Sequence, residues 1–327
     1  MIRLIAIGLF CGLALKATAI QATGLELSLP VDCALGSDCF IQNYVDNDPG
    51  PGVLDYRCGA AAYNGHKGTD FRTLTTNEHV EVIAAAPGRV LATRDGMEDR
   101  LVLNEEDKGG ITDRECGNGI VLDHGNGWQT QYCHLRNGSI AVKRGQMIER
   151  GQPLGLIGYS GLAAFPHLHL AVRFNGSVVD PFLGAKPRKS CFAQGLTQEQ
   201  SLWDSSFHNP ETRIVDTGFS DAPVNTRELE NHHPGPVSEH SGAIIYWARI
   251  LNLEAGEQLH LKALGPGNFL LEKFFDPMQK HKAQYAVYIG KKQQRESAWP
   301  HGTYTGLIRI LRDRQEIETK TIKFTIE

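Results

Sequence analysis

Two histidine motifs, both set in glycine-rich β-type sequence, carry side chains that could do chemistry. In Gly65-His66-Lys67-Gly68-Thr69-Asp70 the histidine and the aspartate are four residues apart. On a strand they would lie about 13 Å apart, at ~3.3 Å per residue, but the flanking glycines permit a tight loop that brings both inward. In His167-Leu168-His169 both imidazoles point to one face of a strand and can enter one site.

A third motif is Tyr132-Cys133-His134-Leu135. On a strand, Tyr132 and His134 share a face and Cys133 points the other way, free for a disulfide. Zinc hydrolases commonly keep three protein ligands, such as two histidines and a carboxylate, and an open position for a water whose pKa falls near 7. Two further histidines could act as base, acid or oxyanion stabiliser. The spacing alone does not say which histidine of the H-x-H pair binds metal.

These motifs and their order resemble those of the lysostaphin-type (LytM-like) zinc metallopeptidases. The resemblance covers about residues 65–182 and includes AAPGRV at 85–90, GNGIVLDHGNG at 117–127 and VKRGQ at 142–146. It implies an open antiparallel β-sheet with one Zn²⁺ per chain at the bottom of a groove. The implied activity is that of a zinc endopeptidase cleaving peptide stems or cross-links of bacterial peptidoglycan.

The same resemblance assigns roles to individual residues. It implies the zinc ligands His66, Asp70 and His169. It implies that His134 and His167 are catalytic histidines and that Tyr132 lines the groove near the scissile bond, whereas His124 belongs to a structural turn. One departure is Phe165, which stands where the family often has glycine and could reshape a groove wall.

Two other function classes compete with this interpretation. A non-catalytic relative that binds peptidoglycan and activates cell-wall amidases is the alternative, but such relatives have lost metal ligands and all five positions are filled here. A serine hydrolase at Ser160 is rejected, because Gly158-Tyr159-Ser160-Gly161 is not a G-x-S-x-G elbow.

The elements that must position these residues are predicted to be mainly β. Residues 58–184 alternate short β-type runs with glycine turns and are predicted to form the peptidase domain. Residues 185–241, rich in proline, are interpreted as a linker with one short strand near Ile214. Residues 242–327 return to alternating strands and predict a separable immunoglobulin-like β-sandwich without catalytic groups.

The N-terminal part predicts export. Arg3, an apolar run of 12 residues and Ala17-Thr18-Ala19 are typical of a signal peptide over residues 1–19, too short to span a bilayer. No stable membrane insertion is expected after its removal, and the protein is predicted to be periplasmic or secreted. Residues 20–57 are interpreted as a lead-in segment that could cover the groove, as in some relatives.

Composition and cysteine content agree with an exported globular protein. The 327 residues are 41% hydrophobic and 21% charged, and the net charge of -4 argues against a nucleic-acid partner. Six cysteines remain after the signal segment, which favours disulfides over a cysteine-zinc site because no C-x-x-C pair occurs. The pairing expected is Cys33–Cys39, Cys58–Cys116 and Cys133–Cys191.

Overall fold

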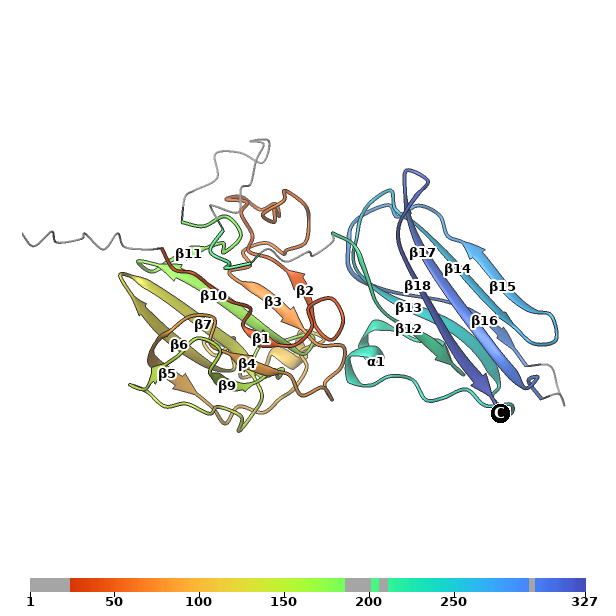
Figure 1. Cartoon of the computed structure of the whole chain (residues 1–327), viewed down its shortest axis with the longest axis horizontal. Coiled ribbons are helices and arrows are strands. Elements are labelled where there is room, and N and C mark those ends of the chain that lie inside the picture. The colour runs from red at the N-terminus through yellow and green to blue at the C-terminus, as the bar shows by residue number, and fades with distance from the viewer. Residues whose placement is uncertain (1–23, 186–200, 206–210, 294–297) are drawn as a thin grey trace, which may run out of the picture.

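The structure is a computed structural model that describes residues 24–185, 201–205, 211–293 and 298–327. The predicted signal segment and Cys191 lie outside these residues. The described chain is mainly β, as expected, and forms two units side by side with a short helix between them (Figure 1). Every pairing between its named strands is antiparallel.

The elements of the N-terminal unit are β1 (Val31–Asp32), β2 (Phe40–Asn43), β3 (Thr69–Arg72), β4 (Glu81–Ile83), β5 (Gly88–Arg94), a 3-10 helix (Glu106–Lys108), β6 (Asn118–Gly125), β7 (Trp128–Leu135), β8 (Met147–Ile148), β9 (Pro153–Leu156), β10 (His167–Phe174) and β11 (Ser177–Val179). Those of the C-terminal unit are β12 (Arg213–Ser220), α1 (Thr226–Asn231), β13 (Ala243–Leu253), β14 (Gln258–Gly265), β15 (Phe269–Phe274), β16 (Lys282–Lys292), β17 (Gly302–Arg312) and β18 (Gln315–Ile326).

The N-terminal unit is an open sheet of order β2-β3-β10-β7-β6-β5-β8, with β11 paired to β10. A smaller sheet, β1-β4-β9, closes one face of it, and the core lies between the two. On strand β10, side chains alternate between the two faces of the sheet, and Leu168, Leu170 and Val172 are buried in this core. The alternate residues His167 and His169 therefore face the opposite side of the sheet.

Residues 24–57 are built into this unit. Strand β1 pairs with β4, and β2 pairs with β3 at the edge of the large sheet. The Cys33–Cys39 disulfide, which the sequence predicted, closes the turn between β1 and β2. The segment interpreted as a lead-in is thus a structural part of the sheet that carries Asp70.

The C-terminal unit packs the sheet β12-β13-β16 against the sheet β15-β14-β17-β18 around a second core, the sandwich that the alternating pattern predicted. The strand expected near Ile214 is β12, and it pairs with β13 along its length. Ile214 and Val215 are both buried. Regular structure of the C-terminal unit therefore begins before residue 242, the boundary expected from composition.

The two other expected disulfides, Cys58–Cys116 and Cys133–Cys191, are both wrong. Cys116 is bonded to Cys133, and Cys58 belongs to a further disulfide. The reason is the β6–β7 hairpin, which brings Cys116 and Cys133 to a Cα–Cα distance of 4.8 Å although they are 17 residues apart. Only the antiparallel register reveals this proximity.

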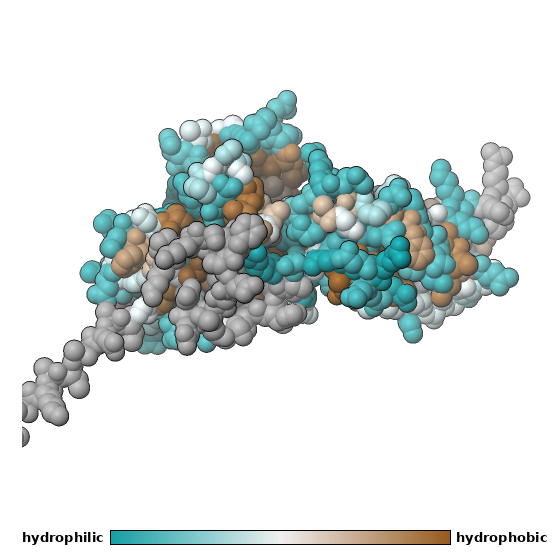
Figure 2. Space-filling model, turned by 90° about the horizontal axis from the view of Figure 1, so that it is seen from above, coloured by the Kyte–Doolittle hydropathy of each residue, from teal (hydrophilic) through white to brown (hydrophobic). Residues whose placement is uncertain are grey.

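No helix of the described residues is long and apolar enough to cross a membrane. The face of the molecule seen from above is largely hydrophilic, with separate hydrophobic patches (Figure 2).

Candidate metal centre and catalytic groove

The sheet brings His66, Asp70 and His169 together. Asp70 on β3 lies directly opposite His169 on β10, so the two side chains share a face. His66 enters from the loop before β3, where Gly65 takes a φ of +76°. A Cβ on Gly68 would lie 2.6 Å from Nε2 of His169, so glycine is needed there as well.

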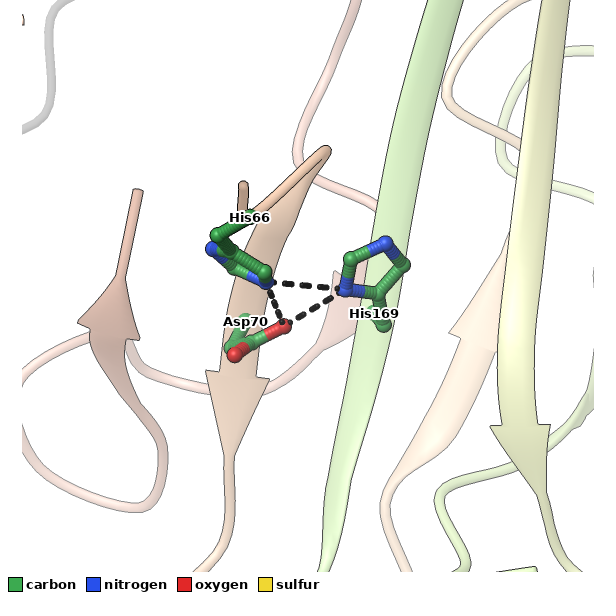
Figure 3. A group of neighbouring side chains, drawn as sticks. All are labelled: His66, Asp70 and His169. Carbon is green, nitrogen blue, oxygen red and sulfur yellow. Dashed lines mark hydrogen bonds and ion pairs between the residues drawn. The ribbon is translucent and has the colours of Figure 1, made fainter. Parts of the chain in front are cut away.

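The three side chains converge on one point (Figure 3). Oδ1 of Asp70 lies 3.2 Å from Nε2 of His66 and 2.9 Å from Nδ1 of His169, and the two nitrogens are 3.1 Å apart. Nδ1 of His66 donates to the carbonyl oxygen of Tyr44 at 2.6 Å. In the neutral ring Nε2 then carries a lone pair that faces a carboxylate. Two imidazole nitrogens and a carboxylate oxygen are a set of ligand atoms that fits a cation such as zinc.

Two residues of the N-terminal segment form hydrogen bonds with two of these candidate ligands. The Tyr44 carbonyl fixes the tautomer of His66, and Asn43 Nδ2 donates to Oδ2 of Asp70 at 2.8 Å. Partners of this kind orient metal ligands. The sequence reasoning missed both, because only the β2–β3 pairing places residues 43 and 44 beside the H-x-x-x-D motif.

The electrostatics of the cluster favour positive charge. Burial by itself raises the pKa of Asp70, but the neighbouring His66 and His167 and the hydrogen bonds from His169 and His66 hold it well below its usual range. Burial opposes protonation of His66, yet the Asp70 carboxylate raises the His66 pKa overall. The Asp70 carboxylate at the centre of the site is therefore ionised, and a buried negative charge of this kind is stabilised by a bound cation.

His134 and His167 stand beside the cluster. Their ring centroids are 4.6 Å apart, and Nε2 of His167 is 3.6 Å from Oδ1 of Asp70. Each ring donates from Nδ1 to a backbone carbonyl, His134 to Ser160 at 2.7 Å and His167 to Phe165 at 2.8 Å. The neutral rings consequently keep an accepting lone pair on Nε2.

Both of these histidines are set up to stay neutral. Burial lowers the pKa of His134 well below its usual value, and any charge on the neighbouring His167 or His169 would lower it further. Burial also lowers the pKa of His167, against the opposing influence of Asp70. Neutral imidazoles can accept a proton near pH 7, as a general base must.

Tyr132 does not line the groove. Its side chain is fully buried in the core, where the hydroxyl accepts a 2.9 Å hydrogen bond from the Ala85 N–H. The prediction that Tyr132 and His134 share a face fails because His134 has a φ of +63°, which breaks the alternation of the strand. Instead Cys133 lies opposite His169 in the register, on the groove face.

A cavity of about 350 Å³ is lined by Asp70, His134 and His167. Its walls come from the loop before β3, the long β5–β6 loop and the segment before β10. Lining residues include Asn43, Tyr63, Leu103, Lys108, Leu162 and Phe165. Tyr63, whose ring centroid is 4.4 Å from that of His66, had no recognisable signal in the sequence.

The departure at Phe165 and the turn at His124 have clear structural roles. The Phe165 ring stacks on the His167 ring with centroids 4.4 Å apart, so it forms a groove wall against a candidate catalytic residue. His124 is remote from the cavity and bridges the Pro87 carbonyl and the Thr130 hydroxyl. This bracing is the structural role expected for it.

Comparison with known proteins places this geometry in a family. Residues 64–181 match Peptidase family M23. Peptidoglycan DD-endopeptidase ShyA of Vibrio cholerae is 37% identical over 93 residues, covering 27% of this chain and 21% of that protein. DD-carboxypeptidase/endopeptidase Mpg of Neisseria meningitidis is 34% identical over 111 residues, covering 33% and 23%.

Among solved structures, the catalytic domain of lysostaphin from Staphylococcus simulans is 23% identical, covering 42% of this chain and 85% of that one, with a TM-score of 0.28. This chain spans less than a quarter of the length of the two endopeptidases that it matches. The family match lies within the unit that carries the histidine cluster. Residues 64–181 of this chain therefore form a domain of Peptidase family M23, the LytM-like peptidases.

Proposed function

We propose that the protein is a zinc-dependent endopeptidase that cleaves peptide stems or cross-links of bacterial peptidoglycan. The observation that carries the proposal is the convergence of His66, Asp70 and His169 beside two buried histidines, His134 and His167, which line one cavity together with Asp70. The substrate class is supported by the names of the relatives, which are peptidoglycan endopeptidases. Peptidoglycan lies outside the cytoplasmic membrane, so this substrate class supports a periplasmic or secreted location.

His66 Nε2, Asp70 Oδ1 and His169 Nδ1 would hold the zinc. Zinc held by three protein ligands acts as a Lewis acid and lowers the pKa of a coordinated water. The chain supplies the rest of the site, since Asn43 and Tyr44 hold two of the ligands in place.

His134 and His167 would move the protons of the reaction. With Nδ1 of each ring engaged by a carbonyl, Nε2 is the atom that can take a proton from the attacking water. Hydrolysis of an amide also requires a proton on the leaving nitrogen, and a ring protonated in the first stage can return it. The positively charged ring also stabilises the developing oxyanion.

The groove would hold the peptide. Phe165 and Leu103 give the cavity apolar lining, and Lys108 adds a positive charge to it. Phe165 stands at a position where glycine is common in the family, so this part of the lining is a candidate determinant of substrate preference.

The experiment that tests the proposal is mass spectrometry of the fragments released from purified peptidoglycan by the mature protein, with and without a chelator. We expect peptide fragments whose release stops on chelation and returns with zinc. The amidase-activator alternative predicts no release by the protein alone under either condition. Full activity in a preparation without bound metal would also overturn the proposal.

A further inference from the structure

Two fully buried arginines share one buried carboxylate where the two units meet. Arg72 on β3 and Arg249 on β13 have no exposed surface, and Glu230 on α1 is 3% exposed. Nη2 of Arg72 lies 2.6 Å from Oε2 of Glu230, and Nη1 of Arg249 lies 3.7 Å from its Oε1. An unpaired buried charge is costly, so Glu230 is the group that permits Arg72 to be buried.

The other donors of Arg72 are also satisfied from both units. Its Nη1 donates to Oε1 of Gln42 at 2.6 Å and to Oε1 of Gln284 at 3.3 Å. Gln284 in turn donates to Glu230 Oε1 at 2.6 Å. Burial, and then the charge of Arg72, lowers the pKa of Arg249 to about 10, although the carboxylates of Glu230 and Asp216 oppose the shift. Arg72 is thus held in a fixed orientation by β2, α1 and β16.

The guanidinium of Arg72 contacts Phe165, which lines the cavity beside His167. Arg72 is the Cα partner of His167 in the β3–β10 register. Its guanidinium carbon lies 4.9 Å from the centroid of the Phe165 ring. Phe165 in turn contacts His167, through ring stacking at 4.4 Å and through the carbonyl that accepts from Nδ1. Direct contacts therefore run from Glu230 through Arg72 and Phe165 to His167.

We propose that Arg72 and Glu230 are positioning residues for His167, and that the C-terminal unit is thereby a structural part of the catalytic groove. The inference rests on the proposed function of His167 as a catalytic residue. It differs from the role that the sequence predicted for the C-terminal unit, which was a separable β-sandwich without catalytic groups. A planar cation fixed from α1 holds the Phe165 ring, and the ring and its carbonyl hold the imidazole.

The test uses the full-length protein and the variant Glu230→Gln, which keeps the shape of the side chain and removes its charge. We expect zinc content to stay at the wild-type level, kcat to fall about 10–100-fold because the base is misplaced, and KM to change much less. The matched control is Arg213→Met, which removes the contact of Arg213 with the Gly36 carbonyl, a different link between the units. The control should lose thermal stability but keep kcat.

Arg72→Lys is a second variant in case Glu230→Gln does not fold. Lysine keeps the charge opposite Glu230 but lacks the planar fork that contacts Gln42 and the Phe165 ring. It should show the same loss of kcat at normal zinc content. A purely structural ion pair would instead be largely preserved by lysine, and kcat with it.

Histidine side-chain NMR gives a readout that does not depend on activity. The Nδ1–H of His167, bonded to the Phe165 carbonyl, should exchange faster and shift in Glu230→Gln and Arg72→Lys. The Nδ1–H of His134, bonded to Ser160 on the other wall, should stay unchanged as an internal control. If the wild-type protein releases no peptides, the proposed function fails while this measurement still decides the inference. An unmoved His167 resonance, or an active wild type whose kcat is unaffected by both variants, would overturn the inference.

Discussion

Asn43 binds the one carboxylate oxygen of Asp70 that the histidines leave free. Its Nδ2 donates to Oδ2 at 2.8 Å, whereas Oδ1 faces His66 and His169. Both Asn43 and Asp70 are almost completely buried, so the hydrogen bond fixes the plane of the carboxylate. The edge strand β2 therefore orients the central candidate ligand, although it lies far outside the histidine motifs.

Replacing Asn43 with alanine should lower zinc affinity about 10–100-fold, because the carboxylate loses the partner that orients it. Equilibrium titration of the metal-free protein with zinc measures this directly. Asn47→Ala is the matched control, since Asn47 lies in the same segment but bonds to Asp180 and the Val45 carbonyl. Equal zinc affinities in the two variants would show that the Asn43 contact does not support the site.

Tyr132→Phe should destabilise the protein without changing KM. The hydroxyl of Tyr132 is the acceptor for the buried Ala85 N–H, and an unsatisfied buried donor costs about 1–3 kcal/mol. Denaturant unfolding of the metal-free protein measures the loss. Tyr63→Phe is the comparison, because Tyr63 is 55% exposed and should change the free energy of unfolding by less than about 0.5 kcal/mol. A higher KM in Tyr132→Phe with unchanged stability would show instead that Tyr132 lines the groove and contacts the substrate.

The sequence predicted those parts of the site that depend on local periodicity. The i, i+2 rule placed His167 and His169 on one face, and the glycines around His66 predicted a loop rather than a strand. The same rule failed at Tyr132 and His134, because a positive φ at His134 turns the imidazole away from the direction that the pleat dictates. No sequence pattern marks that torsion angle.

What could not be predicted depends on contacts between distant segments. The Cys116–Cys133 pairing follows from the β6–β7 register, and the contact of Asn43 with Asp70 follows from the pairing of an edge strand. The ion pair of Arg72 with Glu230 joins residues 158 positions apart. Each is a product of tertiary packing, whereas the mainly β fold and the two cores could be read from alternation and turns.

Peptide mapping without reduction should recover Cys116 linked to Cys133 and Cys33 linked to Cys39. Because the first bond closes a 17-residue separation and the second only 6, loss of the first should cost about 3 kcal/mol and loss of the second about 2 kcal/mol. Unfolding of the paired alanine variants checks the order. Recovery of Cys58 linked to Cys116 would contradict the hairpin register.

Protonation of His124 should destabilise the fold. Burial lowers the pKa of His124 below the unfolded value of about 6.5. The unfolded chain then binds more protons than the folded one between these two values, so this contribution to stability is present above about pH 6.5 and is lost as pH falls toward the folded pKa. In metal-free protein, His124→Gln should therefore show a smaller drop in Tm between about pH 7.5 and about pH 5.5. An identical drop in both proteins would show that His124 does not titrate differently on folding.

The candidate ligands and the catalytic histidines should respond differently to substitution. His66→Ala and Asp70→Ala should empty the metal site, with activity lost as a consequence, because each removes one of three converging ligand atoms. His134→Ala should keep its zinc, since Nδ1 of its ring is bonded to the Ser160 carbonyl and the ring supplies none of the three converging ligand atoms. Metal analysis of the purified variants distinguishes the two groups, and a zinc-free His134→Ala would contradict the division.

The most direct test of the account is zinc content measured beside turnover for His169→Ala and His167→Ala. The two substituted residues are two positions apart on β10. The structure places Nδ1 of His169, and not the His167 ring, within 3.1 Å of His66 Nε2. His169→Ala should therefore lose zinc. His167→Ala should keep zinc and lose about 10²–10⁴-fold in rate, as expected for removal of a general acid–base group. If His167→Ala empties the site while His169→Ala remains metallated and inactive, the two roles are exchanged and the account is wrong.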